Sequence, residues 1–381
     1  MKAFIRSESG VRSSESEHYN FRIITSNKDL DGTTLNVSPN KWIQHSPNTQ
    51  VYYSSTNDII PVIQNEISKN KPDLFFIIGL YDWNYNFKPM RKFKDIPKIV
   101  SVRGMLHPGA LSQKSFKKKL YLGMWKMIGL HKNITFHATD EEEAKYVREV
   151  FGSKVKVKVA GNFPNAFPQF ATLRKLKGEL KLATVALVSP MKNILETLKV
   201  LVESGKWKVD SSESGFGSRE SEAFNTIGYN IYGPIKDEEY WKKCKEVISR
   251  MPPGLKVNYH GAVSGEELEL ALINCHVFIL PSKSENYGHS LVEALSAGRP
   301  VITSENVPWK GLRELQAGIN INGQLTMDNG QLSEAIEFFV GMEQEELDEW
   351  SKGARKYFEK AVDVEKIRKE YGLMFNQFNT Q

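Results

Sequence analysis

The chain's 381 residues are too many for one ordinary hydrophobic core and sufficient for two domains, and 40% hydrophobic with 25% charged residues is typical of a soluble globular protein. Its two cysteines, Cys244 and Cys275, have no metal-ligand spacing and argue against a disulfide framework; no apolar run is long enough for a membrane span or an N-terminal signal peptide. The net charge of +6, small for this length, favours anionic partners. We therefore expect a cytoplasmic protein, soluble or peripheral on the inner face of the cytoplasmic membrane.

Short apolar runs alternate with helical patterns through the first half of the chain. We expect strands at 1–5, 21–25, 74–79, 98–102, 134–139 and 155–160, and helices at 57–69, 115–130 and 140–151. Thr139 or Asp140 can cap the last of these helices, whose first turn is acidic. This alternation predicts an α/β domain with a parallel sheet and crossover helices.

The same pattern then restarts in the second half. We expect strands at 182–188, 226–233, 255–261, 277–282 and 301–304, and helices at 193–203, 237–250, 265–275, 288–297, 332–341 and 345–361. A segment rich in Pro and Asn separates the two series, so we predict domains at 1–165 and 166–360, with a C-terminal helix in 361–381 that packs back toward the first domain. Two such domains leave a cleft at the carboxyl ends of both sheets, where open α/β folds bind ligands.

Two similar Ser/Glu-rich segments, Ser7–Glu17 and Ser212–Glu222, interrupt this pattern. Neither has an apolar face to bury, so we expect both to be solvated loops. The first takes the place where a helix should link the first two strands.

The segment Leu280–Trp309 carries the most chemistry. A buried strand ends, a polar loop follows, and Gly288 opens a helix. The N–H groups of the first helical residues, His289, Ser290 and Leu291, have no acceptor within the helix, so they attract a phosphate. Because Gly288 has no side chain, the phosphate can approach the backbone closely.

Two glutamates flank this helix start. Glu285 lies just before it and Glu293 lies in its second turn. A carboxylate accepts two hydrogen bonds from vicinal hydroxyls, such as those of ribose or a hexose. One acid on each side of a diphosphate therefore describes a sugar-nucleotide site.

This Glu-x7-Glu spacing, followed by Ser-Ala-Gly-Arg-Pro-Val-Ile and a Pro-Trp pair, resembles glycosyltransferase family 4, the bacterial polysaccharide type. The resemblance covers the chain from about Phe21 to the terminal helices. It implies the GT-B fold, in which two Rossmann-like domains turn their parallel sheets toward a central cleft. It also implies that Glu285 contacts donor-sugar hydroxyls and that Glu293 holds the ribose. The donor pocket would further include Asn286, Tyr287, Gly288, His289, Ser290 and Leu291.

Two other segments of the second half are similar to the same family. Val185–Asn193 resembles the segment in which a lysine clamps the donor pyrophosphate, and Lys192 matches that lysine. The family usually has an arginine there too, where this chain has Leu187. Leu255–Leu268 resembles the strand and loop that hold the nucleobase through backbone groups, which are here those of Gly261, Ala262 and Val263.

In the first half, Lys98–Leu111 resembles the family's loop after the fourth strand, with Arg103 in its basic position. An arginine there can neutralise charge on the departing phosphate or orient the acceptor. Further candidates on the acceptor side are His107 in the same loop, Asp82 at the end of a strand, and Glu143 near the expected cleft floor.

The resemblance implies retaining transfer through an oxocarbenium-like state. In the family the leaving phosphate itself is thought to take the acceptor proton, so no protein base is required, and Glu285, Arg103 and Lys192 are the expected catalytic residues. UDP is the commoner nucleotide in the family. We expect no cofactor and no metal, because the Asp-x-Asp at 29–31 precedes a glycine and is typical of a turn.

The segment Lys114–Lys132 combines lysines and aromatics in a helical pattern. We expect its apolar face, formed by Phe116, Leu120, Met124 and Met127, to pack on the sheet. Its clustered lysines leave open a peripheral contact with an anionic membrane that holds a lipid-linked acceptor.

We therefore expect a transferase that moves a hexosyl unit from a nucleotide sugar, UDP before GDP, to a glycan or lipid-linked saccharide in cell-surface polysaccharide synthesis. Two alternatives keep the fold. One is a non-catalytic nucleotide-sugar-binding protein, which Leu187 favours, and the other is a sugar-nucleotide epimerase. We expect no nucleic-acid partner, since the basic residues form no recognisable reading motif.

Overall fold

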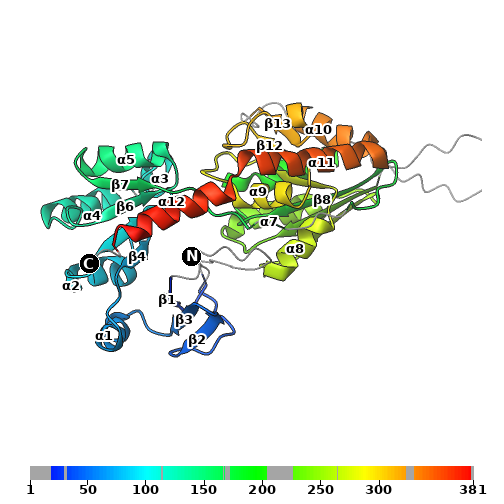
Figure 1. The fold of residues 1–381 in the computed structure, drawn as a ribbon. Helices are drawn as coiled ribbons and strands as arrows, with labels where there is room; N and C mark the ends of the chain where they lie inside the picture. Colours follow the sequence, from blue (N-terminus) through cyan, green and yellow to red (C-terminus); the bar gives the residue numbers. More distant parts are fainter. Residues whose placement is uncertain are drawn as a thin grey trace, which may run out of the picture. The chain divides into compact units, whose positions relative to one another are not determined.

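The computed structural model describes residues 19–29, 32–112, 115–165, 167, 172–203, 226–263, 265–322 and 330–378. They fall into two compact units (Figure 1). Unit 1 runs to Phe163 and takes in the chain from Val364 onward, and unit 2 runs from Pro164 to Asp363. The expected strand at 1–5 and both Ser/Glu-rich segments lie outside the described residues.

The core of unit 1 is a parallel four-stranded sheet. Its order is β4-β5-β6-β7, formed by β4 (Phe75–Ile78), β5 (Lys98–Ser101), β6 (Thr135–Ala138) and β7 (Lys156–Val159). Every residue of β5 and β6 is buried. β4 is only partly buried, and β7 alternates exposed lysines with half-buried valines, as an edge strand does.

A second, smaller sheet of unit 1 was not predicted in full. It has the order β1-β3-β2, with β1 (Phe21–Ser26), β2 (Trp42–Ser46) and β3 (Thr49–Ser54). β1 pairs with β3 in parallel, and β2 pairs with β3 antiparallel. We had expected β1 alone, because the sequences of β2 and β3 mix polar and aromatic residues without a clean alternation.

Helices surround these sheets. They are α1 (Ile60–Lys69), α2 (Lys88–Lys92), α3 (Pro108–Ser112), α4 (Ser115–Met127), α5 (Glu141–Phe151) and α12 (Val364–Asn376), with a π-helical turn, η2 (Trp83–Phe87). Asp140 caps α5 by accepting from the Glu143 N–H at 2.7 Å. In α12, Met374 packs on Ile99 of β5, so the terminal helix belongs to this unit.

Helix α4 corrects one expectation. Of the face that we expected against the sheet, Phe116, Leu120 and Met127 are instead 79%, 67% and 81% exposed. Leu122 and Trp125 take the buried positions, at 5% and 0%. The Trp125 indole and the Leu122 side chain fill the core beside β6. Their packing decides which face of α4 is buried.

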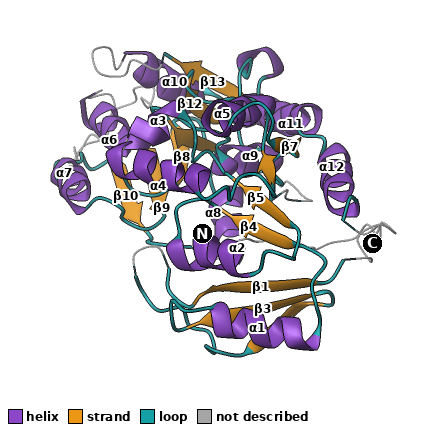
Figure 2. Ribbon diagram, turned by 90° about the vertical axis from the view of Figure 1, so that its left-hand side faces the viewer, coloured by secondary structure: helices purple, strands orange, loops and turns teal. Residues whose placement is uncertain are grey.

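Unit 2 is built on a six-stranded parallel sheet (Figure 2). Its order is β10-β9-β8-β11-β12-β13, with β8 (Glu179–Val185), β9 (Thr226–Tyr232), β10 (Leu255–Tyr259), β11 (Val277–Leu280), β12 (Val301–Ser304) and β13 (Gly318–Ile321). Its helices are α6 (Ile194–Glu203), α7 (Glu238–Ile248), α8 (Gly265–Ile273), α9 (His289–Ser296), α10 (Gly330–Gly341) and α11 (Gln344–Ala361), with short 3-10 turns η3 (Pro190–Lys192) and η4 (Arg313–Leu315).

The segments that follow β8, β9 and β10 lie close together. At the end of β9, a Cβ on Gly233 would lie 2.0 Å from the Ala186 carbonyl oxygen, so only glycine fits there. The Gly233 N–H donates to the Gly261 carbonyl at 2.6 Å. The loops after β8, β9 and β10 therefore leave the sheet side by side. Within the described part of the chain, no helix is both long and apolar enough to cross a membrane.

Candidate functional site

The loops after β8 and β11 meet at the middle of the unit 2 sheet, where these strands are neighbours. The Lys283 N–H donates to the Met191 carbonyl at 2.9 Å and ties the loops together. As a result, Lys192 forms an ion pair with Glu285, 93 residues away, while both side chains keep some solvent access. The Ser282 hydroxyl also donates to the Glu285 carboxylate, at 2.7 Å. Two residues predicted from separate motifs thus lie in direct contact.

The local backbone explains how Lys192 is presented. Ser189 is extended, η3 forms a single turn, and Asn193 ends it at φ +61°, the left-handed region that asparagine tolerates. Helix α6 then starts in a new direction. The half-buried Leu187 precedes this turn.

The start of α9 is close to the prediction, with one correction. Gly288 has φ +74°, and a Cβ there would lie 3.0 Å from the Leu291 side chain. The Leu291 N–H, which we expected to be unpaired, donates to the Gly288 carbonyl at 3.0 Å, and the Leu291 side chain is buried in the core. The tight Gly288 turn brings its own carbonyl within reach of the Leu291 N–H, so this amide is not available to a phosphate. Asn286 and His289 are exposed, and Ser290 is half-buried.

An aromatic group covers one side of this turn. The Trp309 indole N–H donates to the Tyr287 carbonyl, and the two rings meet edge to face at 5.2 Å. The His289 ring lies 4.8 Å from the Tyr287 ring. Burial, with the nearby Glu293 carboxylate, raises the pKa of the Tyr287 phenol.

Glu293 is a buried carboxyl with a raised pKa. It is 6% exposed, and burial raises its pKa to about 7, while a hydrogen bond from the Asn165 amide at 2.8 Å pulls in the opposite direction. Sequence reasoning missed Asn165, because it lies 128 residues earlier in a segment without periodicity. A buried acid that titrates near neutrality is typical of a functional site rather than of a packed core.

The loop after β10 places the three backbone candidates at the same edge of the sheet. Gly261 turns the chain at φ +72°, Ala262 is exposed, and Val263 is half-buried. The neighbouring His260 stacks on Tyr232 at 4.4 Å. These three residues keep solvent access, although the Gly261 carbonyl already accepts from the Gly233 N–H at 2.6 Å.

In unit 1, Arg103 is a strained and anchored residue. It has φ +48°, its guanidinium donates to the Asn162 side-chain oxygen at 2.5 Å, and its charge lies near the Tyr371 phenol. A non-glycine residue in this conformation stores strain that often marks a functional position. The Arg103 side chain stays half-exposed.

The three other unit 1 candidates hold turns. Glu143 is buried and accepts from the Gly104 N–H and from the Thr139 N–H at 2.6 Å, so its two oxygens tie two loops together. His107 accepts from the Gly109 N–H at 3.1 Å. Asp82 is exposed and caps η2 by accepting from the N–H groups of Asn84 and Tyr85, at 2.8 and 2.7 Å. Each of these side chains stabilises a turn, and the sequence alone did not reveal this role.

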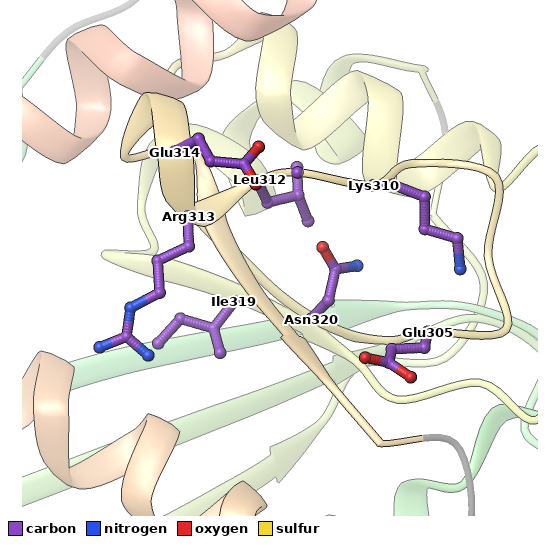
Figure 3. Close-up of a pocket in the computed structure, with 8 residues that line it drawn as sticks. Glu305, Lys310, Leu312, Arg313, Glu314, Ile319 and Asn320 are labelled. Atoms are coloured by element: carbon purple, nitrogen blue, oxygen red, sulfur yellow. The ribbon is translucent and has the colours of Figure 1, made fainter.

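A cavity of about 280 Å³ lies beside β13 and next to the end of β12 (Figure 3). Figure 3 shows the side chains of Lys310, Asn320 and Glu305 converging on it. The Asn320 amide donates to the Trp309 carbonyl at 2.9 Å, which links the cavity wall to the aromatic group. None of the predicted donor residues lines this cavity. Among the residues described, no group of three or more His, Cys, Asp or Glu side chains is arranged to hold a metal ion.

Comparison with solved structures identifies the architecture. Sucrose-phosphate synthase from Thermosynechococcus elongatus superposes with a TM-score of 0.69 at 14% identity, over 95% of this chain and 90% of that one. Anabaena Alr3699/HepE, solved in complex with UDP-glucose, gives a TM-score of 0.57 at 13% identity, over 86% of each chain. At such identities the likeness shows the fold alone, and that fold is the expected GT-B architecture of two α/β domains with parallel sheets.

Two curated proteins match in sequence. Mannosylglucosylglycerate synthase of Thermotoga maritima is 24% identical over 222 residues, which is 54% of this chain and 52% of that protein. Sulfoquinovosyl transferase SQD2 of Arabidopsis thaliana is 35% identical over 60 residues, which is 16% of this chain and 12% of that protein. The chain therefore matches about half, or less, of the length of these relatives.

The sequence of this chain also matches a known protein family over half of its length. The family described as "Glycosyl transferases group 1" matches residues 167–357, which is half of the chain and includes Lys192, Glu285 and Glu293. The chain belongs to the glycosyl transferases group 1 family.

Proposed function

We propose that this protein is a retaining glycosyltransferase that transfers a hexosyl unit from a UDP-sugar to a saccharide or lipid-linked acceptor. Family membership supports the reaction class, and the complex of Alr3699/HepE with UDP-glucose supports the choice of donor. The observation that carries the proposal is the contact between Lys192 and Glu285 beside the start of α9. Cell-surface polysaccharide synthesis is the setting that we propose, on the family resemblance.

The proposed donor pose follows from the charges at this edge of the sheet. The diphosphate rests against the His289 and Ser290 amides at the positive end of α9. Lys192 turns from the Glu285 carboxylate to the leaving phosphate, and Glu285 is then available to accept from hydroxyls of the donor sugar. Their ion pair thus holds both groups in place until the donor replaces it.

Glu293 fits the ribose role because of its burial. Burial deprives the Glu293 carboxylate of hydrogen bonds from water. Two vicinal ribose hydroxyls can replace two of these hydrogen bonds, whereas the Asn165 amide supplies one. Ribose binding is therefore tied to the ionised state of Glu293. The backbone of Gly261, Ala262 and Val263 remains the proposed support for the base.

The proposed chemistry needs no protein base and no metal. The bond from the anomeric carbon to the diphosphate oxygen breaks through an oxocarbenium-like state, and the acceptor oxygen attacks from the same face. The acceptor proton passes to the departing phosphate oxygen. Lys192 stabilises the charge that develops on that phosphate.

An assay of donor consumption with and without acceptor tests this proposal. Transfer from a UDP-sugar to a saccharide, with the anomeric configuration kept, is the expected result by proton NMR. Donor binding without any turnover would favour the non-catalytic alternative, for which Leu187 in place of the usual arginine is the supporting observation. Turnover of the donor sugar without an acceptor, to an epimer, would favour the epimerase.

We also propose that α4 places the enzyme on an anionic membrane. Four large apolar side chains at this helix and its end are open to solvent: Phe116, Leu120, Met127 and Ile128, at 79%, 67%, 81% and 44% exposure. Exposed lysines accompany them at 117, 119 and 126, whereas Lys118 packs on the Tyr81 ring at 5.4 Å. Apolar side chains flanked by free cations match a bilayer with anionic headgroups.

The expected free energy of α4 binding to an anionic membrane is large enough to measure. Burying a large apolar side chain gains about 1.5–3 kcal/mol, and each lysine near an anionic surface adds about 1 kcal/mol. Sedimentation with phosphatidylglycerol-containing vesicles should deplete the wild-type protein, and neutral phosphatidylcholine vesicles should deplete much less. Leu120→Asp should abolish binding, while Leu270→Asp, at a similarly exposed leucine of α8, should not. Equal loss in both variants would count against α4.

A further inference from the structure

Unit 1 contains a hollow that no part of the proposed donor chemistry uses. It has a volume of about 550 Å³ and lies beyond the carboxyl ends of β3 and β4. We call it the Trp83 hollow, and its lining consists of Asp58, Ile60, Trp83, Phe87, Lys88, Arg91 and Lys92. β4 belongs to the parallel four-stranded sheet, and the carboxyl ends of such strands are where open α/β domains bind ligands.

One wall of the hollow is an aromatic platform. The Trp83 indole stacks on Phe87 with centroids 4.2 Å apart and planes 14° apart, yet Trp83 is 47% exposed. Phe87 is buried, so it covers one face of the indole and fixes its orientation. An exposed, oriented indole face carries negative quadrupole density and suits the C–H face of a sugar ring.

The backbone of η2 is built to present this platform. Asp82 accepts from two successive N–H groups, those of Asn84 and Tyr85, and so fixes the turn on which Trp83 sits. The turn is π-helical, a rare geometry that is found frequently at functional sites. Asp82, which we had predicted to touch an acceptor, therefore acts as a positioning residue for Trp83.

A cationic wall adjoins the platform, because α2 continues directly from η2. Lys88, Arg91 and Lys92 line it from α2, whereas Met90 of the same helix is buried in the core. Helix α1 begins at the hollow too, which adds the positive end of its dipole. Asp58 is the single acid of the lining, and its carboxylate accepts from the Ile60 N–H at 3.3 Å. Three cations against one engaged acid favour an anionic ligand.

We propose that the Trp83 hollow binds an anionic sugar residue of the acceptor, with the ring on Trp83 and its carboxylate or phosphate against Arg91 and Lys92. This deepens the proposed function, because it names the chemical class of the acceptor. It accounts for an exposed tryptophan and a cationic helix at the same edge of one unit. An aromatic face selects for a sugar, and the cations select for its charge.

Saturation-transfer NMR and calorimetry with the full chain test this site. The probes are glucuronic acid, glucose 6-phosphate and glucose, which separate the carboxylate and phosphate sources from a neutral ring. We expect at least one charged probe to bind tenfold or more tighter than glucose. Trp83→Ala should weaken that binding about tenfold, and Trp83→Phe, which keeps a platform, should retain most of it.

The cationic wall has its own matched control. Arg91→Gln with Lys92→Gln should remove the preference for the charged probe, whereas Lys94→Gln, at an exposed lysine outside the hollow, should leave it intact. Equal binding of glucose and the charged probes, no binding of any probe, or equal losses with Lys94→Gln would overturn the proposal. UDP-glucose affinity is measured in parallel, since its retention in these variants keeps a failure here distinct from a failure of the donor site.

Discussion

Replacing Glu293 with Gln should stabilise the unliganded protein, and only at higher pH. The Glu293 pKa rises from the ordinary 4.5 to about 7 because the carboxyl is buried. A raised pKa means that the folded state disfavours the charged form, so ionising Glu293 costs stability as the pH rises from 4.5 through 7. A shift of this size corresponds to about 3 kcal/mol. Gln has nearly the same shape and carries no charge, so it escapes this penalty.

The difference in free energy of unfolding between Glu293→Gln and wild type should therefore depend on pH in a defined way. It should be near zero at pH 4.5, grow between pH 4.5 and 7, and level off at about 3 kcal/mol by pH 8. Guanidinium unfolding followed by tryptophan fluorescence at these pH values measures it. Glu266→Gln, at an exposed carboxylate of α8, is the matched control. A difference in free energy of unfolding between Glu293→Gln and wild type that stayed constant from pH 4.5 to 8 would refute the reasoning.

The same titration should appear in ligand binding. If the ribose binds the ionised carboxylate, only about a tenth of the protein is competent at pH 6, and the apparent affinity for UDP-glucose falls about tenfold from its value at pH 8. Calorimetry measures this, and Glu293→Gln should flatten the profile while weakening binding. A flat wild-type profile would show that Glu293 is not part of the donor site.

Three further predictions follow from single contacts. Lys192→Gln should lower turnover by about 10²–10³-fold in a coupled UDP-release assay, since it removes a charge from the leaving group; Lys283→Gln in the adjoining loop should not. Asn165→Ala should move the midpoint of the UDP-glucose pH profile above 7, because the Asn165 hydrogen bond lowers the Glu293 pKa; an unmoved midpoint would exclude that contact in solution. Gly233→Ala should destabilise the protein by about 3 kcal/mol or more in denaturant unfolding, because its Cβ would meet the Ala186 carbonyl, whereas Gly228→Ala in the same strand meets nothing within 4 Å and should be mild.

Sequence patterns predicted the parts of the fold that are buried on both faces. β5, β6, β11 and β12 are buried at every residue and have apolar residues at most positions, and the helices between them carry clear periodicity. The sequence pattern did not predict β2 and β3, because most of their side chains are only partly buried and polar and aromatic residues are mixed along them. The rotation of α4 was wrong for a related reason: periodicity shows that a helix has an apolar face, but packing around Trp125 decides which face is buried.

The candidate site was predictable where its residues follow one strand, and not where they meet across the sequence. Glu285, Gly288 and Glu293 were found from one contiguous segment, and Lys192 from another. Their ion pair, and the contact of Asn165 with Glu293, depend on strand order and on a linker without pattern. The duties of Glu143 and Asp82 in holding turns were equally hidden, because an acid in a motif does not reveal which N–H groups it accepts from.

The most direct test of the donor site is a crystal structure of the protein with UDP-glucose. We predict that the diphosphate lies within about 3 Å of the His289 and Ser290 amides, that Lys192 has left Glu285 for a phosphate oxygen, and that the ribose has replaced Asn165 at Glu293. A nucleotide bound at any other edge of the unit 2 sheet, with the Lys192–Glu285 pair intact, would contradict the account.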